Sequence, residues 1–415
     1  MRFLCVHIIC RTEDTFHPRG LFKMRPESAR AVIIAIMEDF AKDTGLYPPT
    51  STPKRYLWTD AFAVCNFLEL FRITGEAKYK DLAISLVDQV HYVLGRFSRD
   101  DPRNGWISGL DEDEGKKHPT IGGLRIGKPL LERGPDEPFD ERLEWDRDGQ
   151  YFHYLTKWMH ALNRVSRVTG DLTYNRWAID LAKTAHAAFT YVSPVDGKRR
   201  MYWKMSVDLT RPLVPSMGQH DPLDGYVTYN ELEMCGPRDL MEEGEYPDLI
   251  DEIRDIAGIC QGMDLVTDDP LGLGGLLFDS ARVTQMIQSR YMEDVGLLVS
   301  LLNAASEGLR YFMGTGLLDL SAQYRLPFRE FGLSIGLHGL KRIKDWIKEE
   351  DSKLRGYKGL DEVVAKLFGY YHLTEKIEGF WLDSDNQTVQ TWMDHRDINS
   401  VMLATSLGPD GFVLI

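Results

Sequence analysis

Two stretches of the chain are apolar around nearly the whole circumference of a helix, and each is followed by an amphipathic segment. Residues 58–71 (WTDAFAVCNFLELF) and 148–162 (DGQYFHYLTKWMHAL) are rich in aromatic and aliphatic positions, as in helices that are buried on all sides. The segment after the first one, residues 78–94, keeps a polar face and is typical of a helix that covers a core. The pattern predicts helical hairpins with a buried first arm and a partly exposed second arm.

An internal repeat marks the corner of each predicted hairpin. Residues 72–86 (RITGEAKYKDLAISL) recur as residues 167–181 (RVTGDLTYNRWAIDL), with Thr74, Gly75 and Tyr79 matched by Thr169, Gly170 and Tyr174. Glycine is typical of the end of a helix, and the acidic residue that follows it suits the first turn of the next helix. Each copy therefore predicts a tight αα-corner, and repeated corners indicate stacked helical pairs.

Further hydrophobic segments complete a predicted ring of helices. Buried helices are expected near 225, 291, 329 and 390, and covering helices at 26–43, 246–262, 338–350 and 360–376, whereas the hairpin around 300–325 is not assigned. Strand signals are nearly absent, apart from one small β-hairpin expected within 191–205 around Asp196-Gly197. The pattern predicts an all-α fold in which residues 1–415 form a single domain, an (α/α)6 toroid of six helical hairpins.

Long connections are expected on one side of this fold. The segments 97–147, 192–224, 263–280 and 381–389 lead from a covering helix back to the next buried helix. Loops of such length usually carry function, and helix N-termini attract polar ligands through their unpaired N–H groups. The sequence therefore predicts a ligand cleft on the rim where the buried helices begin.

The corner motifs resemble those of a known superfamily. WTD at 58–60 leads into a helix that ends in ITGEAKYKDLA, and DGQYFHYL at 148–155 leads into one that ends in VTGDLTYNRWAIDLA. These segments are similar to the six-hairpin glycosidases, in particular the unsaturated glucuronyl hydrolases, and to the related N-acylglucosamine 2-epimerases; the rest of the chain matches in architecture only. The resemblance implies an enzyme that hydrolyses or isomerises sugars through carboxylates or histidines at the rim. The histidine-rich helix motifs of the epimerases are not found.

Carboxylates at the predicted rim are the candidate catalytic groups, because glycoside hydrolysis requires a proton donor and a base or nucleophile. Asp148 stands with Glu144 and Asp146 before the second buried helix, where crowded carboxylates beside aromatic rings raise a pKa. Glu231 lies inside the aromatic run 226–234. Helix capping is the alternative for Asp148, and an ion pair with an arginine of an outer helix is the alternative for Glu231. The candidate catalytic residues are Asp148, Glu231, Asp60 and Glu330, and Asp221 and Asp224 are further acids on the same rim.

Aromatic and polar side chains near the same helix starts are candidates for substrate binding. Aromatic faces cover the C–H faces of pyranose rings, and polar groups bind the hydroxyls. For the aromatic residues and for His153 the alternative is core packing, and for Arg329 it is an ion pair with Glu330. The candidate binding residues are Trp58, Trp145, Asp146, Tyr151, His153, His220, Tyr229, Arg329, Trp392 and His395.

Composition narrows the class of partner. The net charge of −14 argues against nucleic acids and anionic membranes as partners. The apolar start at 1–10 lacks a cleavage site and is too short to span a bilayer. The scattered cysteines are expected to be reduced thiols of a cytoplasmic protein; they are Cys5, Cys10, Cys65, Cys235 and Cys260. GLGG at 272–275 lacks the context of a nucleotide-binding loop.

Together these patterns lead to one functional hypothesis and two alternatives. We expect a glycoside hydrolase that acts on a short oligosaccharide, a small carbohydrate substrate, by carboxylate acid/base catalysis without a metal or other cofactor. The first alternative is a cofactor-free sugar epimerase or isomerase, in which His153, His220 or His395 moves the proton. The second is a non-catalytic toroid that binds glycans or proteins. The sequence does not predict the oligomeric state.

Overall fold

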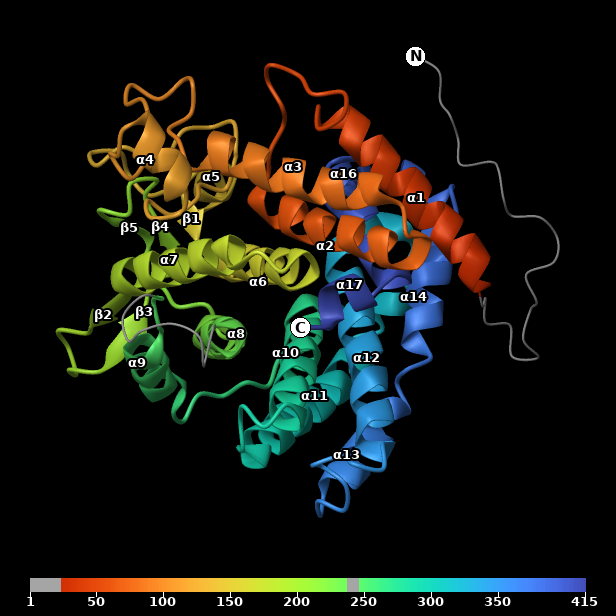
Figure 1. Cartoon of the computed structure of the whole chain (residues 1–415). Helices are drawn as coiled ribbons and strands as arrows, with labels where there is room; N and C mark the ends of the chain where they lie inside the picture. Colours follow the sequence, from red (N-terminus) through yellow and green to blue (C-terminus); the bar gives the residue numbers. More distant parts are fainter. Residues whose placement is uncertain (1–23, 237–245) are drawn as a thin grey trace. The chain divides into compact units, whose positions relative to one another are not determined.

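The computed structural model describes residues 24–236 and 246–415, and these are mostly helical (Figure 1). This confirms the all-α prediction. Residue contacts divide the chain into two compact units, Ala41–Asp264 and Met1–Phe40 with Leu265–Ile415, named here the 41–264 unit and the 265–415 unit. The closed toroid and the single domain stay predictions. Cys5, Cys10 and the apolar start at 1–10 lie outside the described residues.

The 41–264 unit is built from helical hairpins whose first arms pack together. The helix α6 contacts both α2 and α8, and each of these three helices packs against the helix that follows it in the hairpin. The hairpins are α2 (Leu57–Thr74) with α3 (Ala77–Leu94), α6 (Phe152–Thr169) with α7 (Leu172–Phe189), and α8 (Asp221–Cys235) with α9 (Ile250–Cys260). As predicted, α2 is buried continuously from Leu57 to Leu70, whereas α3 buries one face only.

The repeated corners share one backbone geometry. Gly75 and Gly170 end α2 and α6 in the left-handed region, with φ of 72° and 75°, and a Cβ atom on either glycine would have nothing within 4 Å. Glycine is therefore favoured by the dihedral angle rather than by lack of space. The preceding threonines, Thr74 and Thr169, donate their hydroxyls to the carbonyls four residues earlier, at 2.6 and 2.8 Å. The predicted repeat of the corner is confirmed in these hydrogen bonds.

The long segments of this unit contain short helices and strands. The predicted β-hairpin is present, with Thr190 paired to Met201. A second, antiparallel sheet has the order β1-β4-β5 and places Tyr151 opposite Lys204. Because residues 150–151 form a strand, α6 begins at Phe152, later than the predicted start at 148. The short elements are α4 (Glu112–Lys117), α5 (Glu141–Asp146), β1 (Gln150–Tyr151), β2 (Thr190–Val192), β3 (Arg199–Met201), β4 (Lys204–Met205) and β5 (Pro212–Val214).

The 265–415 unit is organised around a long helix, α12 (Pro327–Lys348), which packs most extensively against α10 (Pro270–Gln288). The helix expected at 26–43 is present as α1 (Pro26–Asp43). Its residues up to Phe40 are grouped with the 265–415 unit, and its last residues, from Ala41, with the 41–264 unit. The remaining helices are α11 (Val295–Gly314), α13 (Leu360–Phe368), α14 (Leu373–Leu382), α15 (Gln390–Met393), α16 (Arg396–Leu407) and α17 (Asp410–Val413), with 3-10 turns η1 (Leu317–Asp319), η2 (Ala322–Tyr324) and η3 (Asn386–Thr388).

Glycines bring α10 and α12 into backbone contact. A Cβ atom on Gly274 would lie 2.0 Å from the carbonyl oxygen of Gly332, and one on Gly336 would lie 2.5 Å from the carbonyl oxygen of Gly274. Such distances leave no room for any side chain at the crossing. Within the GLGG segment at 272–275, Gly274 is thus the glycine at the helix crossing.

Several boundaries predicted for this unit are wrong. The expected loop at 263–280 contains the first half of α10, which starts at Pro270 after the capping residue Asp269; proline at the first position of a helix and glycine at a close crossing both read as loop signals in a sequence. The buried helix expected near 291 is α11, which buries only one face.

The other errors concern predicted segments that the structure joins into one helix or divides into two. The segments predicted separately at 329 and 338–350 form the single helix α12, and the segment 360–376 is divided between α13 and α14. The helix expected near 390 is interrupted between α15 and α16.

Candidate functional site

Aromatic side chains gather where α2 and α6 begin. We call Tyr56, Trp58, Tyr151, His153 and Tyr154 the aromatic cluster. The rings of Trp58 and Tyr154 have centroids 5.2 Å apart, and those of Tyr151 and His153 are 5.3 Å apart. The hydroxyls of Tyr56 and Tyr154 are hydrogen-bonded at 2.7 Å. The predicted binding residues Trp58, Tyr151 and His153 are therefore brought together.

His153 faces a carboxylate from the start of α8. Its Nδ1 lies 3.8 Å from Oδ1 of Asp221, which is too far for a hydrogen bond. Within the described part of the chain, Nδ1 of His153 and Oδ2 of Asp221 are buried atoms without a hydrogen-bond partner. The Asp221 side chain is only 10% exposed and that of His153 26%. Buried polar atoms of this kind call for a partner that the protein itself does not supply.

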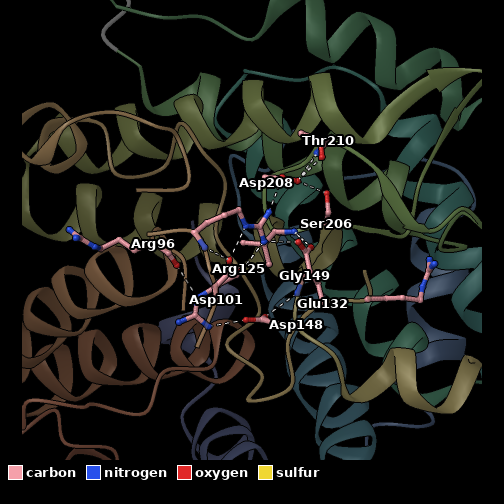
Figure 2. A network of polar contacts seen from close by, with 12 residues as sticks. Arg96, Asp101, Arg125, Glu132, Asp148, Gly149, Ser206, Asp208 and Thr210 are labelled. Atoms are coloured by element: carbon pink, nitrogen blue, oxygen red, sulfur yellow. Dashed lines mark hydrogen bonds and ion pairs between the residues drawn. The ribbon is translucent and has the colours of Figure 1, made fainter. Parts of the chain in front are cut away.

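Asp148, the first candidate acid, has both carboxylate oxygens occupied. Oδ2 accepts from Nη1 of Arg125 at 2.8 Å, and Oδ1 accepts from the backbone N–H groups of Gly127 and Gly149, each at 3.0 Å. The Asp148 side chain is 3% exposed. Figure 2 shows Arg125 and Asp148 within a network of polar contacts that joins several loops. This geometry gives Asp148 the role of holding the segment 125–149 in place.

Arg103 connects the same network to the loop after β4. It pairs with Asp101, Glu132 and Asp208 at 2.7 to 2.8 Å. The hydrogen bonds that it donates, first to Asp101 and then to Glu132, raise the pKa of the guanidinium. Glu132 also accepts from the backbone N–H of Val207 at 2.6 Å. Asp101, Glu132 and Asp208 can be followed in Figure 2. The long loops of the 41–264 unit are thus fixed to each other by ion pairs.

Two more predicted catalytic residues of this unit are engaged in structural contacts. Asp60 accepts the backbone N–H of Tyr56 at 2.9 Å and lies 3.5 Å from Arg55, so it stabilises the start of α2. Glu231 is completely buried and contacts Nδ1 of His160 at 2.8 Å. The carboxylate of Glu231 therefore belongs to a core pair, with a histidine of the buried helix α6 in place of the outer-helix arginine that was expected as the alternative.

The remaining candidates of the 41–264 unit differ in exposure. Tyr229 is fully buried, and its hydroxyl contacts the carbonyl oxygen of Ala182 at 3.4 Å. His220 is a half-buried residue at the N-cap of α8. Trp145 and Asp146 are exposed at the end of α5, and the Trp145 ring lies 6.2 Å from that of Tyr151. Trp145 is thus joined to the aromatic cluster by a ring contact.

Four predicted site residues belong to the 265–415 unit. Glu330 is completely buried and accepts two hydrogen bonds from Arg325 and one from Trp381. Trp392 is 4% exposed and stacks on Trp381 with a centroid separation of 5.7 Å. These contacts give both residues a packing role.

The other two candidates of this unit lie nearer the surface. Arg329 pairs with Asp269, the N-cap residue of α10, which fulfils the ion-pair alternative with a different carboxylate than expected. His395 is exposed, and its ring lies 5.6 Å from that of Phe328.

Asp221, Tyr154 and Trp203 are the site residues that sequence reasoning did not select. Asp221, named from the sequence only as a further acid on the rim, is the first residue of α8, and Asp148 lies four residues before α6. Both mark the start of a buried helix, so sequence position cannot separate a free carboxylate from a bonded one. Tyr154 lies within the DGQYFHYL motif. Trp203 directly precedes β4, and only the pairing of β4 with β1 brings it to Tyr151, with rings 6.5 Å apart.

A surface cavity of about 630 Å³ lies elsewhere in the 41–264 unit, between β3 and α9. Lys198, Arg199, Asp251, Arg254 and Asp255 line it, and Arg199 and Arg254 are already paired with Asp255 and Asp251. The aromatic cluster is not part of its lining. Because both of its carboxylates are already paired with arginines and it is open to solvent, we place the candidate site at the aromatic cluster and Asp221 instead.

Neither a membrane span nor a metal cluster is found among the described residues, and the sequence matches no family model and no curated protein. Among the described residues, no helix is long and apolar enough to cross a bilayer, and no three His, Cys, Asp or Glu side chains are grouped to hold a metal ion. Comparison of the sequence with protein-family models finds no match, and comparison with curated proteins finds no matching relative. The candidate site is therefore defined by its own geometry, the His153–Asp221 pair beside the aromatic cluster.

Proposed function

We propose that the protein is a glycoside hydrolase that acts on a short oligosaccharide at the aromatic cluster and Asp221. The observation that carries the proposal is the pair of buried, unpartnered polar atoms on His153 and Asp221 next to the rings of Trp58 and Tyr151. Aromatic rings beside a few convergent polar groups are what a sugar requires, because the rings pack on its C–H faces and the polar groups bind its hydroxyls.

The starts of α6 and α8 make the pair suitable for a polar ligand. His153 is in the first turn of α6 and Asp221 in the first turn of α8. Nδ1 and Oδ1 are 3.8 Å apart, so a ligand hydroxyl or a water that bonds to both lies to the side of the line between them, where it accepts from an imidazole N–H and donates to the carboxylate. A water held in this way is positioned to lose its proton to Asp221 during attack on a sugar carbon.

Glycoside hydrolysis also requires a second carboxyl group, which protonates the leaving oxygen. Asp148, Glu231 and Glu330 are bonded to cations, backbone amides or core side chains, so we do not assign them to chemistry. We choose Asp146, which is exposed and whose charge acts on the half-buried Lys128. Asp221 and Asp146 are thus the proposed catalytic pair, with His153 binding substrate.

The test is an overnight incubation with a panel of oligosaccharides and free sugars, read by mass spectrometry and NMR. Products shortened by one sugar unit, and lost in Asp221→Asn and in Asp146→Asn, are the expected result. Asp81→Asn is the matched control, because Asp81 is exposed on α3 and outside the site. Cleavage that survives Asp221→Asn unchanged would refute the assignment.

A second candidate function, a cofactor-free sugar epimerase, is favoured by His153 itself. Its free Nδ1 suits an imidazole that removes and returns a proton next to a carbonyl. In that case the panel should yield isomers of unchanged mass, and His153→Gln should abolish their formation. A toroid that only binds glycans predicts an intact panel. The closure of six hairpins into that toroid remains a prediction, which the three hairpins of the 41–264 unit support for their part.

A further inference from the structure

Trp145 presents an indole ring to solvent from a short, firmly held helix. The residue is 44% exposed and lies near the end of α5, which spans only Glu141–Asp146. A single turn of helix has little stability of its own. The interactions that stabilise α5 must therefore come from the residues around it.

The support of α5 is a buried lysine. Nζ of Lys204 donates to the backbone carbonyl and carboxylate of Glu144 at 2.7 and 3.0 Å, and to the backbone carbonyl of Arg147 at 2.9 Å. The Lys204 side chain is 0% exposed and that of Glu144 3%. Arg133 contacts the second carboxylate oxygen of Glu144 at 3.0 Å. Every donor of the ammonium is used on both sides of Trp145, so the position of the indole is fixed before any ligand arrives.

Ring contacts connect Trp145 to the proposed site. Its centroid lies 5.0 Å from that of Trp203, in an edge-to-face arrangement, and 6.2 Å from that of Tyr151. Tyr151 in turn lies 5.3 Å from His153, so these two steps limit the distance from Trp145 to His153 to about 12 Å. Trp203 supports one edge of the exposed indole, and Tyr151 lies between the indole and the His153–Asp221 pair.

We propose that Trp145, supported by Trp203, is a distal subsite that stacks a second sugar ring of a substrate whose reacting sugar lies at His153 and Asp221. A preorganised, solvent-exposed indole is suited to cover the C–H face of a pyranose at low entropic cost. The inference rests on the proposed carbohydrate site and defines its substrate class: linked oligosaccharides, with affinity that increases with chain length, rather than free monosaccharides.

The test is calorimetric titration with cello-, xylo-, manno- and chito-oligosaccharides from disaccharide to hexasaccharide, in an Asp221→Asn background that prevents turnover. For a series that binds, affinity should rise with length. Trp145→Ala should remove about tenfold of the affinity for the longer chains, from the lost stacking, and leave a monosaccharide of the same series unchanged. Trp145→Phe should restore part of it. Tyr357→Ala, an exposed aromatic elsewhere at 51% exposure, is the matched control.

The outcomes separate the two proposals. Affinity that does not depend on chain length, a Trp145→Ala variant that binds long chains as the parent does, or failure of every series to bind overturns the distal subsite. If the wild-type protein cleaves none of the series but Trp145→Ala still weakens binding of the longer chains, the hydrolase proposal fails and the subsite stands. Circular dichroism of each variant confirms that α5 can lose its indole without unfolding the chain.

Discussion

Replacing Asp148 by asparagine tests whether this residue serves the fold or the chemistry. The carboxylate is 3% exposed and its partner Arg125 10%, so the substitution breaks a buried ion pair. The asparagine oxygen can still accept from the N–H groups of Gly127 and Gly149, but its amide group would face Nη1 of Arg125, donor to donor. Removing one partner of a buried pair costs about 3–5 kcal/mol, and the two retained backbone hydrogen bonds place the expected loss near about 3 kcal/mol.

The assay is urea denaturation followed by circular dichroism, with a thermal scan of each variant. A loss of about 3 kcal/mol corresponds to a decrease in Tm of roughly 6–12 °C for a unit of this size. Asp146→Asn is the matched control, because Asp146 is exposed and its change should stay within about 0.5 kcal/mol. A double-mutant cycle with Arg125→Met should give a coupling energy of about 2 kcal/mol or more.

One result would refute this reasoning. If Asp148→Asn unfolds at the same urea concentration as the wild type, the contacts to Arg125, Gly127 and Gly149 do not stabilise the fold. If that stable variant also loses activity on the carbohydrate panel, Asp148 is the catalytic acid that the sequence predicts, and Asp146 loses its assigned role.

Three further predictions concern the helices. His91 is buried and accepts a hydrogen bond from Trp158, and burial lowers its pKa from 6.5 to about 3. Protonation therefore favours the unfolded chain, and stability is unaffected above pH ~6.5. Between pH 7.5 and pH 5 the wild type should lose about 2 kcal/mol more of its free energy of unfolding than His91→Gln, measured by urea denaturation at both pH values. Equal losses would contradict the burial argument. Gly274→Ala should destabilise the 265–415 unit by about 3 kcal/mol, because its Cβ would meet the backbone of α12. Gly275→Ala, whose Cβ would have nothing within 4 Å among the described residues, should be neutral or stabilise by up to about 1 kcal/mol. Both are measured by the same denaturation experiment, and similar effects of the two substitutions would refute the close crossing. Burial raises the pKa of the Cys65 thiol to about 12. Iodoacetamide at pH 8 should therefore leave Cys65 unmodified in the folded protein and modify it in urea, as read from peptide mass spectra. Rapid labelling of Cys65 without urea would contradict this prediction.

The parts of the fold that were predictable from the sequence are those in which local chemistry and burial agree. The corners at Gly75 and Gly170 combine a helix-ending glycine, a threonine that bonds back to the helix and a long apolar segment before it. The helix α10 was missed because its local signals contradict its burial. Pro270 and the glycines at 272, 274 and 275 indicate a loop. In the structure Pro270 opens the helix, and Gly274 is required by its contact with α12.

The candidate site was predictable as a region but not as a set of roles. Aromatic residues before buried helices indicated Trp58, Tyr151 and His153, which do lie together. Asp148 and Asp221 have similar positions in the sequence, yet one has both oxygens bonded and the other has a buried oxygen without a partner among the described residues. That difference depends on Arg125 and on loop backbone, which no periodicity or spacing specifies.

The crossing of α10 and α12 sets a limit on how the 265–415 unit can move. At Gly274 and Gly336 the carbonyl of one helix lies against the Cα of the other, so a turn of either helix that replaced these glycines by a residue with a side chain would bring that side chain into a space that holds none. The two helices are therefore locked in register, and they can move only together. A movement that keeps these backbone contacts leaves the crossing as it is and is confined to the ends of the pair.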